Sequence, residues 1–142
     1  MQMDENVMYL KPSDADLREQ LIFGRNYSPA NYTAGGICHF DNLRYKMAAE
    51  LVRRGFLSPE DKQNEAPTAQ KFIDFMKQHD PDNWILIGYA ISPTREDVRV
   101  SIEGIESVRS LSEHDMVDFL RVFRDADKLI AEDGQPVFGW YD

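Results

Sequence analysis

Residues 83–106 have the sequence NWILIGYAISPTREDVRVSIEGIE, in which two apolar segments flank the polar linker PTRED. The second segment alternates apolar and polar residues, which is the pattern of a strand with one buried and one solvated face. The first segment is apolar on both faces, as expected for a strand inside a sheet or beneath a helix on each side. We therefore predict a β-hairpin over residues 84–106.

A lone hairpin is only marginally stable in water, so the hairpin needs further strands. The candidates are residues 6–10, NVMYL, and residues 136–141, PVFGWY. Together with the hairpin they predict a small, mainly antiparallel sheet.

Two glycines, Gly88 and Gly104, fall inside the predicted hairpin strands. Glycine within a strand marks a β-bulge or the close approach of another backbone. The alternative is that the two glycines line a cleft together with Tyr89, Glu103 and Glu106.

Helix starts are marked by serines that are each followed three residues later by an acid, at Ser13, Ser58 and Ser112. We expect helices at about 14–23, 42–54, 59–64, 67–79 and 113–132. The 142 residues are enough for one domain with a single core. The predicted fold is a single α+β domain over residues 1–142, with the hairpin sheet covered by three to four helices.

Residues 24–40 form the one long stretch without a strand or helix pattern, and we interpret them as a loop. Asp41 is a preferred N-cap residue for the helix that follows the loop. Phe40 and Tyr45 then take the positions of a hydrophobic staple.

The one cysteine of the chain, Cys38, stands next to His39 and just before this helix start. Neighbouring residues of an extended segment point to opposite sides, so His39 is poorly placed to act as a base for Cys38. We predict that Cys38 is a buried, unreactive packing group. The spacings of His39, His79 and His114 match no metal-binding motif. We assign no catalytic residue, no metal site and no cofactor.

Loops longer than about 12–15 residues are uncommon in compact domains and are often functional. The 24–40 loop offers four side chains suited to a small polar ligand: Arg25, Tyr27, Tyr32 and His39. The alternative is a surface loop that its tyrosines anchor to the domain.

The net charge is −9 and is unevenly distributed. Residues 1–71 carry nine Lys/Arg and ten Asp/Glu, whereas residues 72–142 carry seven and fifteen. This balance argues against direct nucleic-acid binding and predicts a basic partner for the second half. The longest apolar run, WILIGYAI, is too short to span a bilayer, and the first residues lack a secretory pattern. We expect a cytoplasmic protein without membrane contact.

The absence of a catalytic motif favours a non-enzymatic protein that acts through protein–protein contacts, with a protein partner or as a homodimer. Trp140 and Tyr141, at the end of the last predicted strand, are the candidate partner-binding residues because their aromatic side chains look exposed. One alternative is a small-molecule-binding protein or enzyme that uses the 24–40 loop. A further alternative is an acidic nucleic-acid mimic or inhibitor that uses the helix over 113–132.

Overall fold

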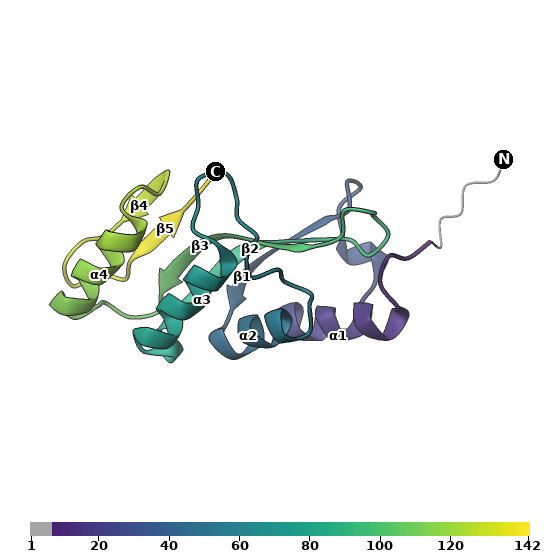
Figure 1. The fold of residues 1–142 in the computed structure, drawn as a ribbon, viewed down its shortest axis with the longest axis horizontal. Helices are drawn as coiled ribbons and strands as arrows, with labels where there is room; N and C mark the ends of the chain where they lie inside the picture. Colours follow the sequence, from purple (N-terminus) through teal and green to yellow (C-terminus); the bar gives the residue numbers. More distant parts are fainter. Residues whose placement is uncertain (1–6) are drawn as a thin grey trace.

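The computed structural model of the chain describes residues 7–142, in which five strands form one antiparallel sheet with the order β1-β2-β3-β5-β4 (Figure 1). The strands are β1 (Ile37–Leu43), β2 (Trp84–Ile91), β3 (Val100–Ser107), β4 (Lys128–Ile130) and β5 (Phe138–Trp140). The predicted hairpin is confirmed as β2 and β3, and β3 is the middle strand of the sheet. The strand predicted within residues 136–141 is confirmed as β5.

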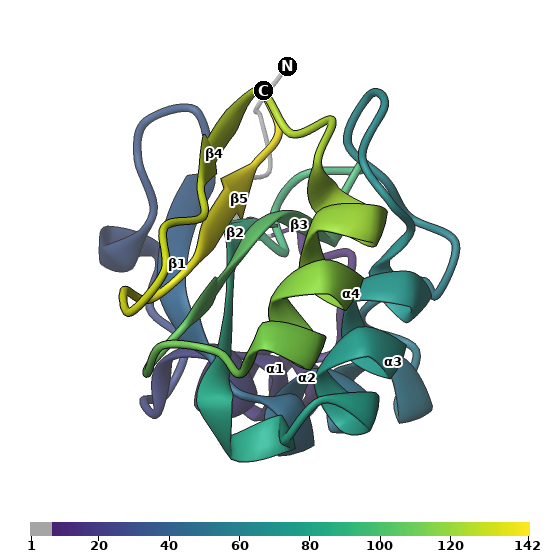
Figure 2. The same cartoon turned by 90° about the vertical axis from the view of Figure 1, so that its left-hand side faces the viewer.

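Four α-helices of the described residues cover one face of the sheet. They are α1 (Pro12–Phe23), α2 (Tyr45–Arg53), α3 (Ala69–Gln78) and α4 (Glu113–Phe123). Figures 1 and 2 place them on the same side of the sheet, and Phe119 and Phe123 of α4 lie next to Gly139 of β5. The α+β class is therefore confirmed.

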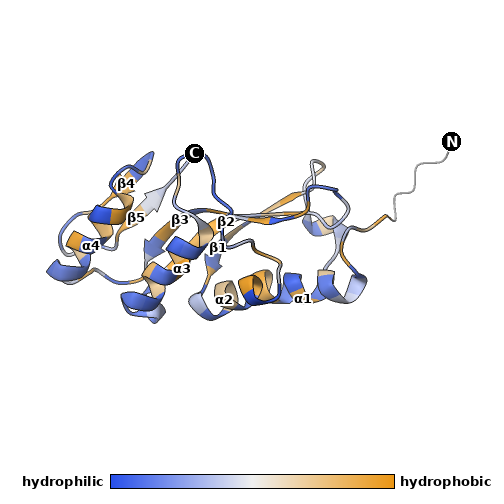
Figure 3. Cartoon of the chain, viewed as in Figure 1, coloured by the Kyte–Doolittle hydropathy of each residue, from blue (hydrophilic) through white to orange (hydrophobic). Residues whose placement is uncertain are grey.

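The core lies between the helices and the sheet and is rich in aromatic rings. The indole of Trp84 stacks on Phe119 with ring centroids 5.8 Å apart, and Phe75 meets Trp84 edge-on at 5.1 Å. Phe72 stacks on Phe123 at 5.4 Å. Figure 3 shows polar and apolar residues alternating along α3 and α4, because only the sheet-facing side of each helix is buried.

The loop predicted over residues 24–40 is shorter than expected, because strand β1 begins within it. The N-cap assigned to Asp41 is wrong, since this residue lies inside β1. The staple of Phe40 with Tyr45 is wrong for the same reason, because α2 begins only at Tyr45.

The physical reason is the pairing of β1 with β2. The register shifts between Phe40 and Leu43, so both of these side chains are buried although three positions separate them. This irregularity hides the period-two pattern from the sequence. Pairing with β2 also satisfies backbone groups along the segment, a long-range interaction that outweighs the local capping preference.

The helix predicted over 113–132 is too long. Helix α4 ends at Phe123, and residues 128–130 form the edge strand β4, which pairs with β5. Between β4 and β5, Gly134 has a φ of 77°, in the left-handed region that favours glycine.

The short helix predicted over 59–64 does not form. The carbonyls of Pro59 and Asp61 accept hydrogen bonds from the N–H groups of Gln70 and Ala69 instead. These carbonyls therefore tie the segment to the start of α3.

Residues 7–10 are not a strand, and residue 6 of the strand predicted over 6–10 lies outside the described residues. The N–H of Tyr9 donates a 2.7 Å hydrogen bond to the carbonyl of Pro93, but no ladder follows.

The remaining helix predictions, 14–23, 42–54 and 67–79, are confirmed to within three residues at each end. The cap at Ser112 is also confirmed, because its hydroxyl accepts from the N–H of Asp115 at 3.1 Å. Ser13 is not the N-cap residue, since α1 already starts at Pro12 and Lys11 takes the N-cap position. Helix α3 is capped by Thr68, which the sequence did not suggest.

The predicted bulge is confirmed between β2 and β3. Ile87 pairs with Gly104 and the next residue, Gly88, pairs with Ile102, so Glu103 is the extra residue of the bulge. Gly88 and Gly104 both lie where another backbone approaches closely.

This crowding makes Gly88→Ala a strongly destabilising change. A Cβ at this position would lie 2.0 Å from the carbonyl oxygen of Ser101, so the backbone of the paired strand would have to shift. We expect a loss of about 3 kcal/mol, the upper end of the usual cost of overpacking, in the free energy of unfolding measured by urea denaturation. The matched control is Gly35→Ala, where the nearest atom is 3.8 Å away. Equal stability of the two variants would contradict the observed register.

Candidate functional site

The face of the sheet opposite the helices is covered by none of the described helices, and we call it the open face (Figure 2). Residues of β2 alternate between the two sides. Leu86 and Ala90 are buried in the core, whereas Ile85, Ile87 and Tyr89 lie on the open face and are half-buried.

Two rows of paired residues cross the open face. The first row consists of Ile87, Gly104, Trp140 and Lys128. The second row consists of Ile85, Glu106, Phe138 and Ile130. We call the apolar residues of both rows the apolar patch: Ile85, Ile87, Ile130, Phe138 and Trp140.

Trp140 takes its position from the glycine beside it. A Cβ on Gly104 would lie 3.4 Å from Cδ1 of Trp140 and 2.6 Å from the carbonyl oxygen of Gly139. Only glycine therefore allows β5 and the indole to approach the middle strand this closely. The result is a half-buried aromatic ring beside the middle strand of the sheet.

Acidic groups lie in the middle strand of the open face. The bulge places the carboxylate of Glu103 there, 3.9 Å from Nδ1 of His39 on β1. Burial raises the pKa of Glu103, the charge of His39 opposes this shift, and Asp142 adds to it. Glu106 stands three residues further along, between Ile85 and Phe138.

Hydrogen bonds between polar side chains occupy the end of the open face around Tyr89. The hydroxyl of Tyr89 donates to Oε1 of Gln63 at 3.2 Å and accepts from Nη2 of Arg99 at 3.2 Å. Arg99 also contacts Asp97. The uncovered apolar area therefore lies toward β5 and β4, at the other end.

The sequence prediction that both terminal aromatics are exposed is wrong for Tyr141. This residue alternates with Trp140 and is 2% exposed, and its hydroxyl donates to Asp125 at 3.0 Å. Burial, followed by the bond to Asp125, raises the pKa of Tyr141.

The four ligand-binding candidates of the 24–40 segment do not meet in one place. Arg25, Tyr27 and Tyr32 gather against α1, with the rings of Tyr27 and Tyr32 5.8 Å apart. His39 lies on the open face, where its ring is 6.2 Å from Tyr89.

A buried network that the sequence did not reveal holds the 24–36 segment to α1. Arg18 and Glu19 are both at most 1% exposed. The hydroxyl of Tyr32 donates to Oε1 of Glu19 at 2.6 Å and accepts from Nη2 of Arg18 at 3.2 Å. Arg25 donates to the other oxygen of Glu19 at 2.9 Å, and Arg18 donates to the carbonyl of Ile91 at 2.7 Å.

Cys38 lies beside this network. It is half-buried rather than buried as predicted, and it packs against the core. Nη2 of Arg25 lies 3.4 Å from its sulfur. Its β1 neighbour His39 faces the opposite side of the sheet, as expected for adjacent strand residues.

A second polar cluster joins α3 to α4. The ring of His79 bonds the carbonyl of Phe75 at 2.9 Å and Asp118 at 3.1 Å. Asp118 also contacts His114 and Arg121, at 3.5 and 3.2 Å. The bond from His79 is the largest cause of the lowered pKa of Asp118. Within residues 7–142 no group of three or more His, Cys, Asp and Glu side chains is arranged to hold a metal ion.

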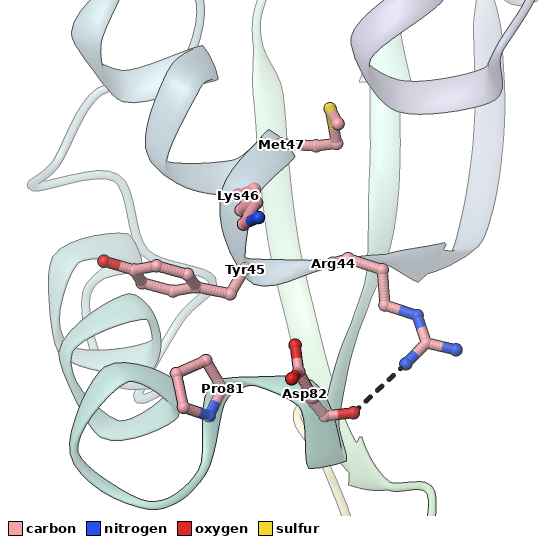
Figure 4. Close-up of a pocket in the computed structure, with 6 residues that line it drawn as sticks. All are labelled: Arg44, Tyr45, Lys46, Met47, Pro81 and Asp82. Atoms are coloured by element: carbon pink, nitrogen blue, oxygen red, sulfur yellow. Dashed lines mark hydrogen bonds between the residues drawn. The ribbon is translucent and has the colours of Figure 1, made fainter.

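A cavity of about 610 Å³ lies at the start of α2, and Figure 4 shows the residues that line it. Its lining includes Arg44, Lys46 and Met47, which are exposed, together with Pro81 and Asp82. Arg44 donates a 3.5 Å hydrogen bond to the carbonyl of Asp82. The charged side chains that line the cavity, Arg44, Lys46 and Asp82, are all exposed to solvent.

Searches against protein-family models, curated proteins and solved structures found no match for this chain. None of the helices described within residues 7–142 has the length and apolar character needed to cross a membrane.

The buried network predicts that the hydroxyls of Tyr27 and Tyr32 contribute differently to stability. The hydroxyl of Tyr32 bonds two buried charged groups, whereas the buried hydroxyl of Tyr27 has no hydrogen-bond partner among the described residues. We expect Tyr32→Phe to lower the free energy of unfolding by about 1–3 kcal/mol, because it leaves Glu19 short of a donor. Tyr27→Phe is the matched control and should be neutral or slightly stabilising. Equal losses in thermal denaturation would contradict the network.

The carboxylate of Glu103 should cost stability at neutral pH. Since burial raises its pKa, the folded protein binds this proton more tightly than the unfolded chain. The ionised carboxylate therefore lowers the free energy of unfolding by its full amount above the pKa of Glu103 in the folded protein. This loss disappears below the pKa of about 4.3 that a glutamate has in the unfolded chain. We expect Glu103→Gln to raise the free energy of unfolding at pH 7 and to leave it unchanged near pH 3. Urea denaturation at both pH values measures this, with the exposed Glu60→Gln as the control. A loss of stability at pH 7 would show that the contact with His39 outweighs burial.

Proposed function

We propose that the protein is a non-enzymatic binding domain whose open face receives a partner protein. The observation that carries this proposal is the apolar patch, which lies on the uncovered side of the sheet and is centred on Trp140. Tryptophan is among the residues that contribute most binding energy to protein interfaces, since it buries a large rigid surface at little entropic cost. Exposed apolar patches rimmed by polar groups are typical of interaction sites.

The architecture supports the same function. The four helices bury the other face of the sheet, so the open face is not needed to complete the core around Trp84 and Phe119. Gly104 keeps the indole of Trp140 beside the backbone of the middle strand. This fixed ring has little freedom to lose on binding, which favours affinity.

The contacts of the 24–40 segment favour a structural role over ligand binding. The polar groups of Arg25 and Tyr32 are already hydrogen-bonded inside the protein. Arg25 donates to Glu19, and the hydroxyl of Tyr32 bonds both Glu19 and Arg18. His39 belongs to the open face and is available there to a partner. Of the partner-binding candidates, Trp140 keeps this role in our proposal and Tyr141 does not.

Site-specific photocrosslinking tests the proposal in cells that express the protein natively. A photoreactive phenylalanine analogue replaces Trp140 in one version and Val117, an apolar residue of α4 that is 51% exposed, in the other. We expect discrete heavier adducts from position 140 only, because Val117 lies on the helical side. The adduct mass distinguishes a second copy of the chain from another protein. Identical patterns, or no adduct at 140, would contradict binding through the open face.

A further inference from the structure

The open face has an acidic centre. Glu103 and Glu106 both belong to β3, the middle strand, and Asp142 is close enough to Glu103 to influence its ionisation. Within the described residues, the basic group recorded within 4 Å of Glu103 is His39, whose side chain is 72% exposed. Within residues 7–142, a carboxylate that is only 14% exposed thus lacks a lysine or arginine partner at that distance.

The basic side chains of the same face lie toward its margins. Lys128 is on the edge strand β4, with Nζ 6.0 Å from the ring centroid of Phe138. Arg99 lies at the other end of the face, where it donates a hydrogen bond to the hydroxyl of Tyr89 and contacts Asp97. The apolar patch is therefore bounded by carboxylates in the middle of the sheet and by one lysine at its edge.

This charge arrangement disfavours three kinds of binding partner for the open face: a second copy of the chain, a nucleic acid and an anionic lipid surface. In a two-fold symmetric dimer the same patch meets itself, so a two-fold axis over the patch would bring the acids of β3 toward their own copies. Like charges across an interface oppose binding. Nucleic acids and anionic lipid surfaces are repelled for the same reason.

From this geometry we infer that the partner of the open face presents a basic polypeptide segment, with lysine or arginine among apolar side chains. The inference rests on the proposed function and names the chemistry of the partner. The apolar side chains of the segment contact the apolar patch around Trp140. Its cationic groups reach Glu103 and Glu106, and at Glu103 they neutralise a carboxylate that has no lysine or arginine partner within 4 Å among residues 7–142.

A displayed library of random peptides provides the test. The library is selected on the wild-type protein, and the enriched peptides are then measured against Trp140→Asp, with Val117→Asp as the matched control. Ile130→Asp, on the edge strand, is a second disruptive variant in case Trp140→Asp does not fold, which circular dichroism would reveal. The peptides are also measured against the Glu103→Gln/Glu106→Gln double variant by fluorescence anisotropy.

We expect peptides rich in lysine or arginine whose binding is lost in the patch variants and kept in Val117→Asp. Their Kd should rise about tenfold in the double variant and should rise further with salt. Two results would overturn the inference and leave the proposed function standing. In the first, the peptides that depend on the apolar patch are neutral or acidic; in the second, their Kd for the double variant equals that for the wild-type protein. A wild-type dimer in sedimentation that the patch variants dissociate would also overturn it, in favour of a second copy. If no enriched peptide depends on the patch, the proposed function itself fails.

Discussion

The bulge at Glu103 determines what the open face presents. Residues of a strand alternate between two sides, so one extra residue in β3 changes the side on which every later residue falls. Beyond the bulge, Ile105 enters the core while Gly104 and Glu106 lie on the open face. A glycine at position 104 then gives space to Trp140 of β5. The acidic and aromatic character of the face thus depends on one irregularity in the central pair of strands.

The two sides of the sheet are stabilised by different means. On the helical side, stacked aromatic rings such as Trp84 and Phe119 form a fully buried core. At the end near α1, a charged network around Arg18 and Glu19 fixes the 24–36 segment. Removing one member of such a network leaves its partner buried and unpaired, which is why buried charged groups act together. Neither the aromatic core nor the charged network involves the open face, so that face is free to contact another molecule.

The sequence predicted the hairpin, the bulge region and three helices to within a few residues, because these features depend on local periodicity and turn chemistry. It failed at β1, where the shifted register puts both Phe40 and Leu43 in the core and hides the strand pattern. It failed again after Phe123, because β4 is stabilised by pairing with β5 rather than by its own three residues. Long-range pairing of this kind has no local sequence pattern.

The candidate site was predicted only in part for the same reason. Trp140 was identified because an aromatic residue near the end of a predicted strand is conspicuous. Its alternation with buried Tyr141 and its pairing across Gly104 need the register of β3 and β5. Arg18 and Glu19 look like ordinary charged residues of an exposed helix, and only the tertiary structure shows that they are buried.

Collisional quenching of tryptophan fluorescence tests most directly whether the open face is an exposed, acidic and aromatic surface. The protein has two tryptophans, and Trp84 is fully buried, so a quencher in solution reaches only Trp140. The surrounding carboxylates should concentrate caesium ions and repel iodide. The structure predicts quenching of part of the emission, with a caesium-to-iodide quenching ratio higher than that of a free tryptophan amide at equal ionic strength. Emission that neither ion quenches, or a ratio no higher than that of the free amide, would contradict an open and acidic face around Trp140.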